Sequence, residues 1–219
     1  ISSFAFGQTY TKIDTLKGSD TAYRNFWDVK KYKLSVEPNF QNKSLKGCNK
    51  IEFTITKDIS NPTFQIDLQE PMKVEKLTAN FPTVDGFKRD GDFIFVTAKK
   101  KFKKGEKYTF DIDYSGNPRI AKHAPWEGGW VFAKDEQGNP WITVAQEGDG
   151  TSLWLPSKDI WNDEPDNGVE MKIITSKDLT GVGNGKLISK TTENGKNIFV
   201  WEVKNPINLY SLAPVIGKF

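Results

Sequence analysis

Apolar and polar residues alternate along most of this chain with a period of two residues. The clearest runs place apolar side chains at Tyr32, Leu34 and Val36; Ile51, Phe53 and Ile55; Phe64, Ile66 and Leu68; Phe110, Ile112 and Tyr114; and Val169, Met171 and Ile173. This period predicts strands with one face on a hydrophobic core and the other in water. We find no apolar stripe of helical period longer than two turns. The pattern predicts an all-β fold of a dozen or more strands, in an antiparallel sandwich-like arrangement.

Turn sequences separate these runs and divide the chain into regions. Asp90-Gly91 and Asn194-Gly195 are typical of tight hairpins, whose central positions favour positive φ. Residues 1–22 are polar and weakly patterned, so we expect a leader segment there and the β-domain over residues 23–219. Residues 115–168 contain the fewest clear strands, and long connections of this kind often carry function.

The counts of cysteine and histidine exclude several classes of enzyme. One cysteine, Cys48, allows no internal disulfide and no thiolate metal cage. Hydrolytic zinc sites usually take two or three histidines, and serine or cysteine nucleophiles usually need a histidine base. The chain has only His123. We therefore expect no catalytic residues, metal ligands or cofactor in this chain, a structural or surface role for His123, and a small hydrophobic strand residue in Cys48.

Charge and hydropathy limit the partners. A net charge of +3 among 219 residues does not indicate that the protein binds nucleic acid. No stretch approaches the roughly 20 apolar residues of a membrane span. A single cysteine fits either redox compartment, and we expect a periplasmic or secreted protein, with the cytoplasm as the alternative.

The segment from Glu147 to Glu170 is acidic and rich in tryptophan. Its acidic residues are Glu147, Asp149, Asp159, Asp163, Glu164, Asp166 and Glu170. They could form a glycosidase pair, bind calcium, recognise a cationic amine, or form a solvated loop. The tryptophans of the middle third are Trp126, Trp130, Trp141, Trp154 and Trp161. They could form a sugar platform, a core, or a face for a partner, so a carbohydrate-binding β-sandwich module is an alternative function.

Six segments, in order, resemble one family. They are Trp27–Leu34, Leu45–Phe53, Phe102–Gly116, Leu155–Pro165, Gly183–Leu187 and Pro206–Phe219. The first is similar to the Tyr-Asp-Val-x-x-Tyr-x-Leu strand of the M1 (gluzincin) family of zinc aminopeptidases, and the fourth resembles its Pro-Cys-x-Asp region. Ser157 stands where the family often has cysteine. The family's catalytic His-Glu-x-x-His signature is absent from this sequence.

The resemblance implies a saddle-shaped N-terminal β-domain that caps a separate zinc-binding catalytic domain and contacts the N-terminus of a peptide substrate. In this family a Gln or Glu nine positions before the Pro of Pro-Cys-x-Asp binds the substrate's free α-amine. Counting back from Pro156 reaches Glu147, beside Gln146. Adjacent side chains of an extended chain point to opposite faces, so only one of the two can enter a cleft. We favour Glu147.

Overall fold

The computed structural model describes residues 9–124 and 126–219, which form one short α-helix, strands in four sheets and two 3₁₀ turns. The helix and the 3₁₀ turns are α1 (Lys12–Gly18), η1 (Thr151–Leu153) and η2 (Leu209–Ser211). The strands are β1 (Trp27–Asn39), β2 (Ser44–Ile55), β3 (Ile59–Ser60), β4 (Thr63–Asp67), β5 (Lys73–Ala79), β6 (Thr83–Asp90), β7 (Phe93–Ala98), β8 (Lys101–Phe102), β9 (Lys107–Gly116), β10 (Gly129–Lys134), β11 (Pro140–Ala145), β12 (Val169–Ser176), β13 (Thr180–Val182), β14 (Lys186–Glu193), β15 (Lys196–Val203) and β16 (Val215–Gly217).

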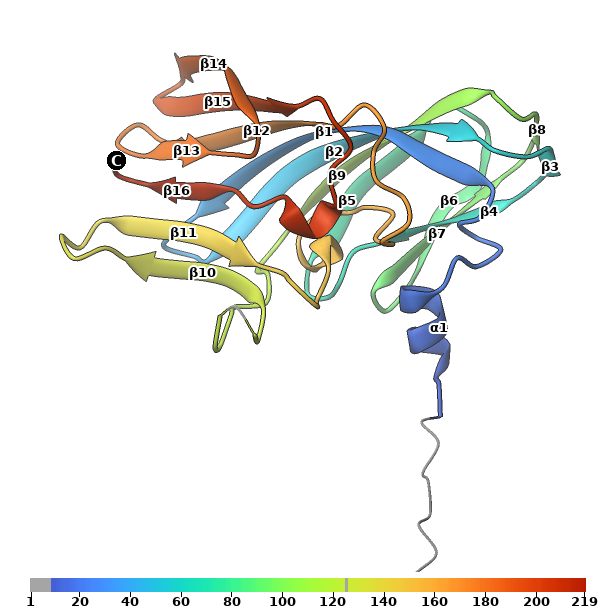
Figure 1. The fold of residues 1–219 in the computed structure, drawn as a ribbon, viewed down its shortest axis with the longest axis horizontal. Coiled ribbons are helices and arrows are strands. Elements are labelled where there is room, and N and C mark those ends of the chain that lie inside the picture. The colour runs from blue at the N-terminus through green and yellow to red at the C-terminus, as the bar shows by residue number, and fades with distance from the viewer. Residues whose placement is uncertain (1–8, 125) are drawn as a thin grey trace, which may run out of the picture.

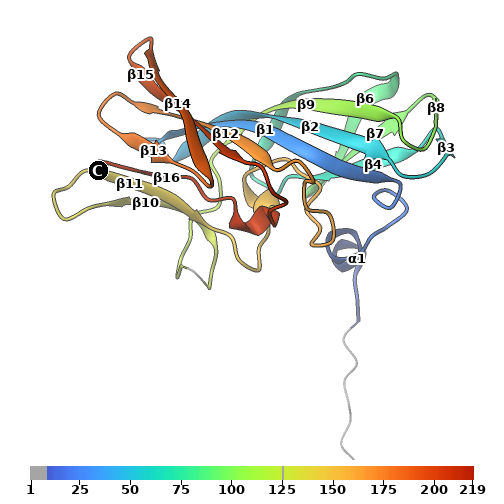
Figure 2. The ribbon, with the colours of Figure 1, turned by 45° about the horizontal axis from the view of Figure 1, so that its top comes forward.

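A large sheet spans the molecule, and smaller sheets pack beneath its two ends (Figures 1 and 2). The large sheet has seven strands in the order β14-β15-β12-β1-β2-β9-β5. Below one end lies the four-stranded sheet β10-β11-β16-β13, and below the other the three-stranded sheet β4-β7-β6. Within the described strands, β1 and β12 pair in parallel, whereas β1 and β2 are antiparallel like the other pairs. The all-β, sandwich-like prediction is confirmed.

Aromatic side chains build the core between the large sheet and the three-stranded sheet. Phe53 of β2 stacks on Phe110 of β9, with ring centroids 5.0 Å apart and planes at 20°. Phe64 of β4 meets them from the opposite sheet, 5.3 Å from Phe110 and 5.7 Å from Trp27. Such pairs add about 0.5–1.5 kcal/mol beyond the burial of their area. These side chains are at most 1% exposed, so the alternating pattern correctly identified the core-facing positions.

Both predicted hairpins are present. Asn194 and Gly195 have φ of 50° and 76° and form the two-residue turn between β14 and β15. The β6–β7 turn is formed by Gly91 and Asp92, one residue later than predicted, because Asp90 still pairs within β6. In the β14–β15 turn both central residues have positive φ, which matches the twist of the flanking strands, whereas in the β6–β7 turn Gly91 has a positive φ, of 58°.

The described part of the leader contains α1, which lies below the β-domain in Figure 1. Its N-terminus has a capping box: Thr11 Oγ1 accepts from the amide of Asp14 at 3.2 Å, and the Asp14 carboxylate accepts from the amide of Thr11 at 2.7 Å. Leu16 is the buried residue of the helix. Residues 1–8 lie outside the described range. No helix in the described ranges is long and apolar enough to cross a membrane.

Candidate functional site

Residues 146–163, here called the site loop, follow β11 and begin with a tight reversal. The amides of Asp149 and Gly150 both donate to the carbonyl oxygen of Gln146, at 3.2 and 3.0 Å. Gly150 has φ of 87°, which glycine adopts without steric penalty. A Cβ at Gly150 would lie 2.2 Å from Asp159 Oδ2, so this position also requires the absence of a side chain.

Gln146 is buried, and both ends of its side-chain amide are hydrogen-bonded. Nε2 donates to the carbonyl oxygens of Tyr210 and Leu212 at 2.9 and 2.7 Å. Oε1 accepts from Trp154 Nε1 at 2.8 Å. Gln146 therefore joins the end of β11 to η2, and at 3% exposure it has no free group to offer a ligand.

Glu147, the next residue, is exposed. No described side chain forms an ion pair with its carboxylate, in contrast to the neighbouring Asp149. The adjacent side chains thus differ in the way expected for consecutive positions: one enters the core and the other faces outward. Of the two candidate residues, Glu147 is the one whose charged group is open to a ligand.

Asp149 holds the connection between β9 and β10 against the site loop. Its Oδ1 lies 2.5 Å from Arg119 Nη2, and its Oδ2 accepts from the amide of Gly128 at 3.1 Å. A Cβ at Gly128 would lie 2.3 Å from the same carboxylate oxygen. The connection between β9 and β10 is therefore held beside the reversal that carries Glu147.

A buried ion pair lies behind the site loop. Arg24 and Asp67 are 0% and 3% exposed, and Arg24 Nη2 donates to Asp67 Oδ2. The same carboxylate accepts from Gln65 Nε2 at 2.8 Å and from the amide of Asp159 at 3.2 Å. Backbone hydrogen bonds of 2.8 and 3.0 Å also join Asp67 to Ser157. Asp67 therefore connects β4 to the site loop.

The sequence pattern does not reveal this pair. Gln65 and Asp67 alternate with apolar residues in β4, so the pattern predicts a solvated polar face. In the structure both faces of β4 are buried, because the leader and the site loop cover the polar one. These covering segments are distant in sequence, so no local signal in β4 could have revealed the burial.

Burial raises the pKa of Asp67 from 3.8 to about 6, because the loss of hydration outweighs the nearby Arg24 guanidinium and the hydrogen bond from Gln65. The folded state then holds this proton more tightly than the unfolded state. The part of the stability that is linked to protonation of Asp67 is therefore fully present below about pH 4 and is lost as the pH rises through about 6, whereas the compensation of the Arg24 charge is a separate contribution of the ionised form. This rise in the pKa of Asp67 corresponds to a change of about 3 kcal/mol in the free energy of unfolding between the two ends of that pH range.

We expect the Asp67 carboxyl to titrate near pH 6 when followed by ¹³C NMR. Asp58 is a suitable internal control, because it is solvent-exposed and its hydrogen bond from Lys103 lowers its pKa below 3.8. A titration midpoint for Asp67 at or below that of Asp58 would contradict the assigned effect of burial.

A second buried pair holds the far end of the site loop. Lys158 Nζ donates to Asp163 Oδ2 and to the carbonyl oxygen of Trp27, the latter at 2.6 Å, and lies 4.9 Å from the centroid of the Trp27 ring. Asp163 Oδ1 accepts from the amide of Val29 at 3.1 Å. The amide of Lys158 donates to Tyr32 Oη at 3.1 Å. Burial raises the pKa of Asp163, and the Lys158 ammonium opposes that shift.

The acidic residues of this region do not gather into one metal site. Asp149 pairs with Arg119, Asp163 with Lys158, and Asp166 with Lys30. Over residues 9–124 and 126–219, no group of three or more His, Cys, Asp or Glu side chains could hold a metal ion. The residues described here therefore do not fit a zinc centre.

The lone histidine and the lone cysteine both lie at the surface. His123 is exposed, with Nδ1 3.1 Å from Glu127 Oε2, so of the structural and surface alternatives its location agrees with the second. Cys48 fills a strand position in β2, as predicted, but its side chain is exposed rather than packed as a small hydrophobic residue. Cys48 lies on the exposed face of β2, 3.1 Å from Ser35 Oγ, while the next residue, Asn49, takes the buried position and donates to the carbonyl oxygen of Pro156 at 2.8 Å.

The tryptophans divide between the core and the surface. Trp130 and Trp154 are fully buried, with ring centroids 5.5 Å apart, so they are not available to a sugar. Trp126 and Trp161 are 85% and 75% exposed. Trp161 of the site loop lies 6.5 Å from the ring of Tyr210 in η2, and the two rings form a small aromatic patch.

Comparisons with known proteins identify a family and solved structures that this chain resembles. The sequence model of the Peptidase M1 N-terminal domain family matches residues 29–210. The solved structures with this fold include an M1 zinc metallopeptidase from Deinococcus radiodurans, with a TM-score of 0.73 and 20% identity over 88% of this chain and 42% of that chain. A mutant M1 zinc metallopeptidase from the same organism, bound to a Tyr-Ser-Ala substrate, has a TM-score of 0.74 and 19% identity over 92% of this chain and 44% of that chain.

This chain therefore spans less than half the length of the solved structures that it resembles. A search of curated protein sequences finds no match. The structural likeness, at about 20% identity, establishes a common fold. Because the family model covers most of the sequence and the strand architecture agrees, the chain belongs to the Peptidase M1 N-terminal domain family.

Proposed function

We infer that this chain is the non-catalytic N-terminal domain of a zinc-dependent aminopeptidase, in which Glu147 binds the free α-amine of the peptide substrate. The observation that carries this proposal is the contrast between Gln146, whose amide is fully bonded in the core, and Glu147, whose carboxylate is exposed. The spacing to Pro156 independently selects the same residue.

A carboxylate at this position would distinguish the end of a peptide from its interior. A charge-assisted hydrogen bond of this kind contributes about 1.5–3 kcal/mol. The terminal residue of a peptide carries an ammonium group, whereas an internal amide does not. Glu147 would therefore favour substrates that present a free N-terminus, which is the selectivity of an exopeptidase.

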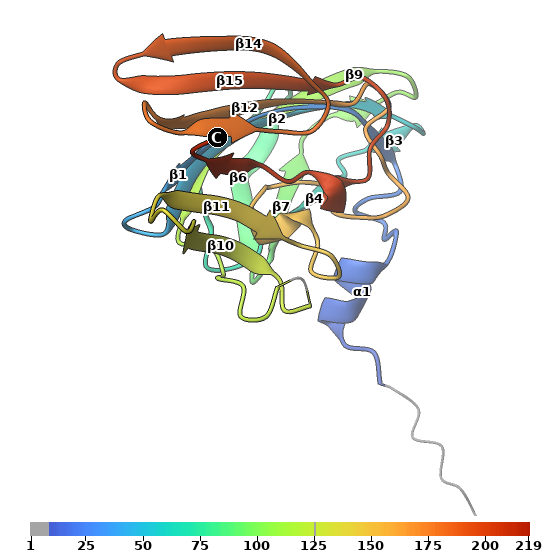
Figure 3. The ribbon, with the colours of Figure 1, turned by 60° about the vertical axis from the view of Figure 1, so that its left-hand side comes forward.

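The surface beside the site loop supports a capping role. Trp161 and Tyr210 form an exposed aromatic pair and Trp126 exposes a third ring, and exposed apolar patches mark surfaces that partners cover. Figure 3 shows η2 and α1 on the side of the molecule away from the large sheet. We propose that a catalytic domain packs against this side and supplies the zinc chemistry, while this domain binds and orients the substrate's amine.

In the enzyme that combines this domain with its catalytic domain, Glu147→Gln is expected to raise KM for aminoacyl anilides about 10- to 100-fold, because the neutral amide loses the charge-assisted contact. The effect should fall mainly on KM, since the substitution leaves the catalytic groups in place. Steady-state kinetics would measure it.

Glu164→Gln is a matched control, since Glu164 is an exposed acidic residue just beyond the site loop. Its kinetics should remain those of the unmodified enzyme. Unchanged KM in Glu147→Gln, or an equal change in both variants, would show that Glu147 does not bind the amine.

A further inference from the structure

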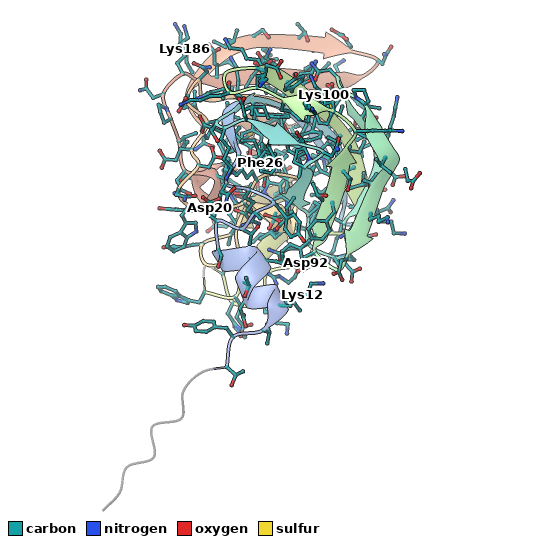
Figure 4. The ribbon with its side chains drawn as sticks, turned by 90° about the vertical axis from the view of Figure 1, so that its right-hand side faces the viewer. Lys12, Asp20, Phe26, Asp92, Lys100 and Lys186 are labelled. Atoms are coloured by element: carbon teal, nitrogen blue, oxygen red, sulfur yellow. The ribbon has the colours of Figure 1, made fainter. Side chains whose placement is uncertain are left out.

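A cavity of about 510 Å³ opens one residue beyond Glu147, between the leader and the site loop. Its lining includes Lys17, Asp20, Gly148, Gly150, Asp159 and Trp161. Figure 4 shows Asp20 where the leader leaves α1 and approaches the body of the domain. The leader wall lies outside residues 29–210, the range that the family model matches. The cavity therefore depends in part on a segment outside the range that the family model matches.

Both walls of the cavity are attached to the same buried ion pair. On the leader side, the carbonyl oxygen of Leu16 accepts from Gln65 Nε2 at 2.9 Å, and that of Lys17 accepts from Arg24 Nη1 at 3.3 Å. On the loop side, the amide of Asp159 donates to the carboxylate of Asp67. The two walls are thus positioned relative to each other by the interior of the domain.

The lining combines an aromatic face with carboxylates. Trp161 is 75% exposed and can pack against an aliphatic stem or a cation. Asp159 Oδ2 accepts from the amide of Ser152 at 2.9 Å, which leaves acceptor capacity on the carboxylate. Asp20 adds a second carboxylate, and among the described lining residues Lys17 supplies the only cation. The balance of charge favours a positively charged group.

We propose that this cavity, the leader pocket, receives the side chain of the substrate's first residue and prefers a long cationic side chain, arginine or lysine. The inference rests on the proposed function, because the α-amine at Glu147 would place that side chain at the mouth of the pocket. The stem would lie on Trp161 and the charged end near Asp20 and Asp159.

The test is a titration of the 219-residue chain with argininamide, norleucinamide and N-acetylargininamide, followed by NMR of the Trp161 indole. Norleucinamide retains an unbranched stem without the charge, and N-acetylargininamide retains the guanidinium without the α-ammonium. Argininamide is expected to bind about two- to fivefold more tightly than norleucinamide, the range of an exposed ion pair. Asp20→Asn should remove that preference, and Lys17→Glu should increase it.

Asp178→Asn is the matched control, because Asp178 is an exposed acidic residue in the β12–β13 turn and should leave the preference unchanged. Equal affinities for argininamide and norleucinamide, or no shift of the Trp161 indole with any amide, would overturn the leader pocket. Glu147→Gln tests the proposed function separately. It should weaken both amides equally; if it weakens neither while the arginine preference persists, the amine site is wrong and the pocket stands.

Discussion

Replacing Asp67 with leucine is expected to lower the free energy of unfolding by about 3–5 kcal/mol at neutral pH. The reason is that Arg24, 0% exposed, would keep its charge in the interior without a carboxylate to compensate it. The site loop would also lose the acceptor for the amide of Asp159. Urea denaturation followed by tryptophan fluorescence would measure the change.

The double variant Arg24→Met/Asp67→Leu separates charge compensation from packing. It should be destabilised less than the single Asp67→Leu variant, because no isolated charge remains buried. Lys103→Met removes an exposed pair with Asp58, whose distance is 2.8 Å and whose lysine side chain is 71% exposed, and should cost no more than about 1 kcal/mol. If Asp67→Leu lowers the free energy of unfolding as little as Lys103→Met does, the buried pair does not stabilise the domain by compensating the charge of Arg24.

Lys158→Ala is expected to destabilise the domain by a similar amount, about 3–5 kcal/mol at neutral pH. Asp163 would remain buried, with a side chain that is 5% exposed and no counter-charge. The pKa of Asp163, already raised by burial, should rise further when the opposing Lys158 ammonium is removed. The loss of stability should therefore be larger at about pH 8 than at about pH 5, because the folded state disfavours the ionised carboxylate.

Adding Asp163→Asn to Lys158→Ala should restore part of that stability. The asparagine carries no charge, and its oxygen can still accept from the amide of Val29 as Asp163 Oδ1 does. The Asp163→Asn substitution should also remove the pH dependence of stability that Lys158→Ala introduces. A Lys158→Ala variant with the same stability loss at both pH values would contradict a role based on charge.

These two pairs explain how a long irregular segment can carry a binding site. The site loop has little regular structure beyond η1. It is positioned instead by Asp67 near Ser157 and Asp159 and by Lys158 within the core. Side chains supported by such interior contacts hold a more constant geometry than those on an unsupported loop. The proposed amine site and the leader pocket both depend on that support.

The strands and hairpins could be predicted because their signals are local. Alternation along β1, β2 and β9 identified buried faces, and Asn194-Gly195 identified a turn through its own backbone preferences. The prediction for Cys48 came from its residue type, and it is exposed because alternation from Ile51 and Phe53 places it on the outer face of β2. The buried face of β2, otherwise apolar, accepts Asn49, because the carbonyl oxygen of Pro156 satisfies its amide.

The candidate site was only partly predictable. The resemblance to a family motif selected Gln146 and Glu147 as a pair, and spacing favoured Glu147. The inward position of Gln146 depends on the carbonyl oxygens of Tyr210 and Leu212, more than 60 residues later. The leader pocket was not predicted at all, because residues 1–22 have no pattern that shows what they pack against.

By itself, the sequence determined the all-β class, the core-facing positions of the main strands, the hairpin turns and the family. Each of these depends on residues close together in the chain or on an ordered set of motifs. Only the tertiary structure decided that Arg24 and Asp67 meet in the interior, that Gln146 faces inward, and that the leader and Gly148 line one cavity. Alternation specifies which side chains share a face of a strand, whereas what covers that face depends on distant segments that close over it during folding.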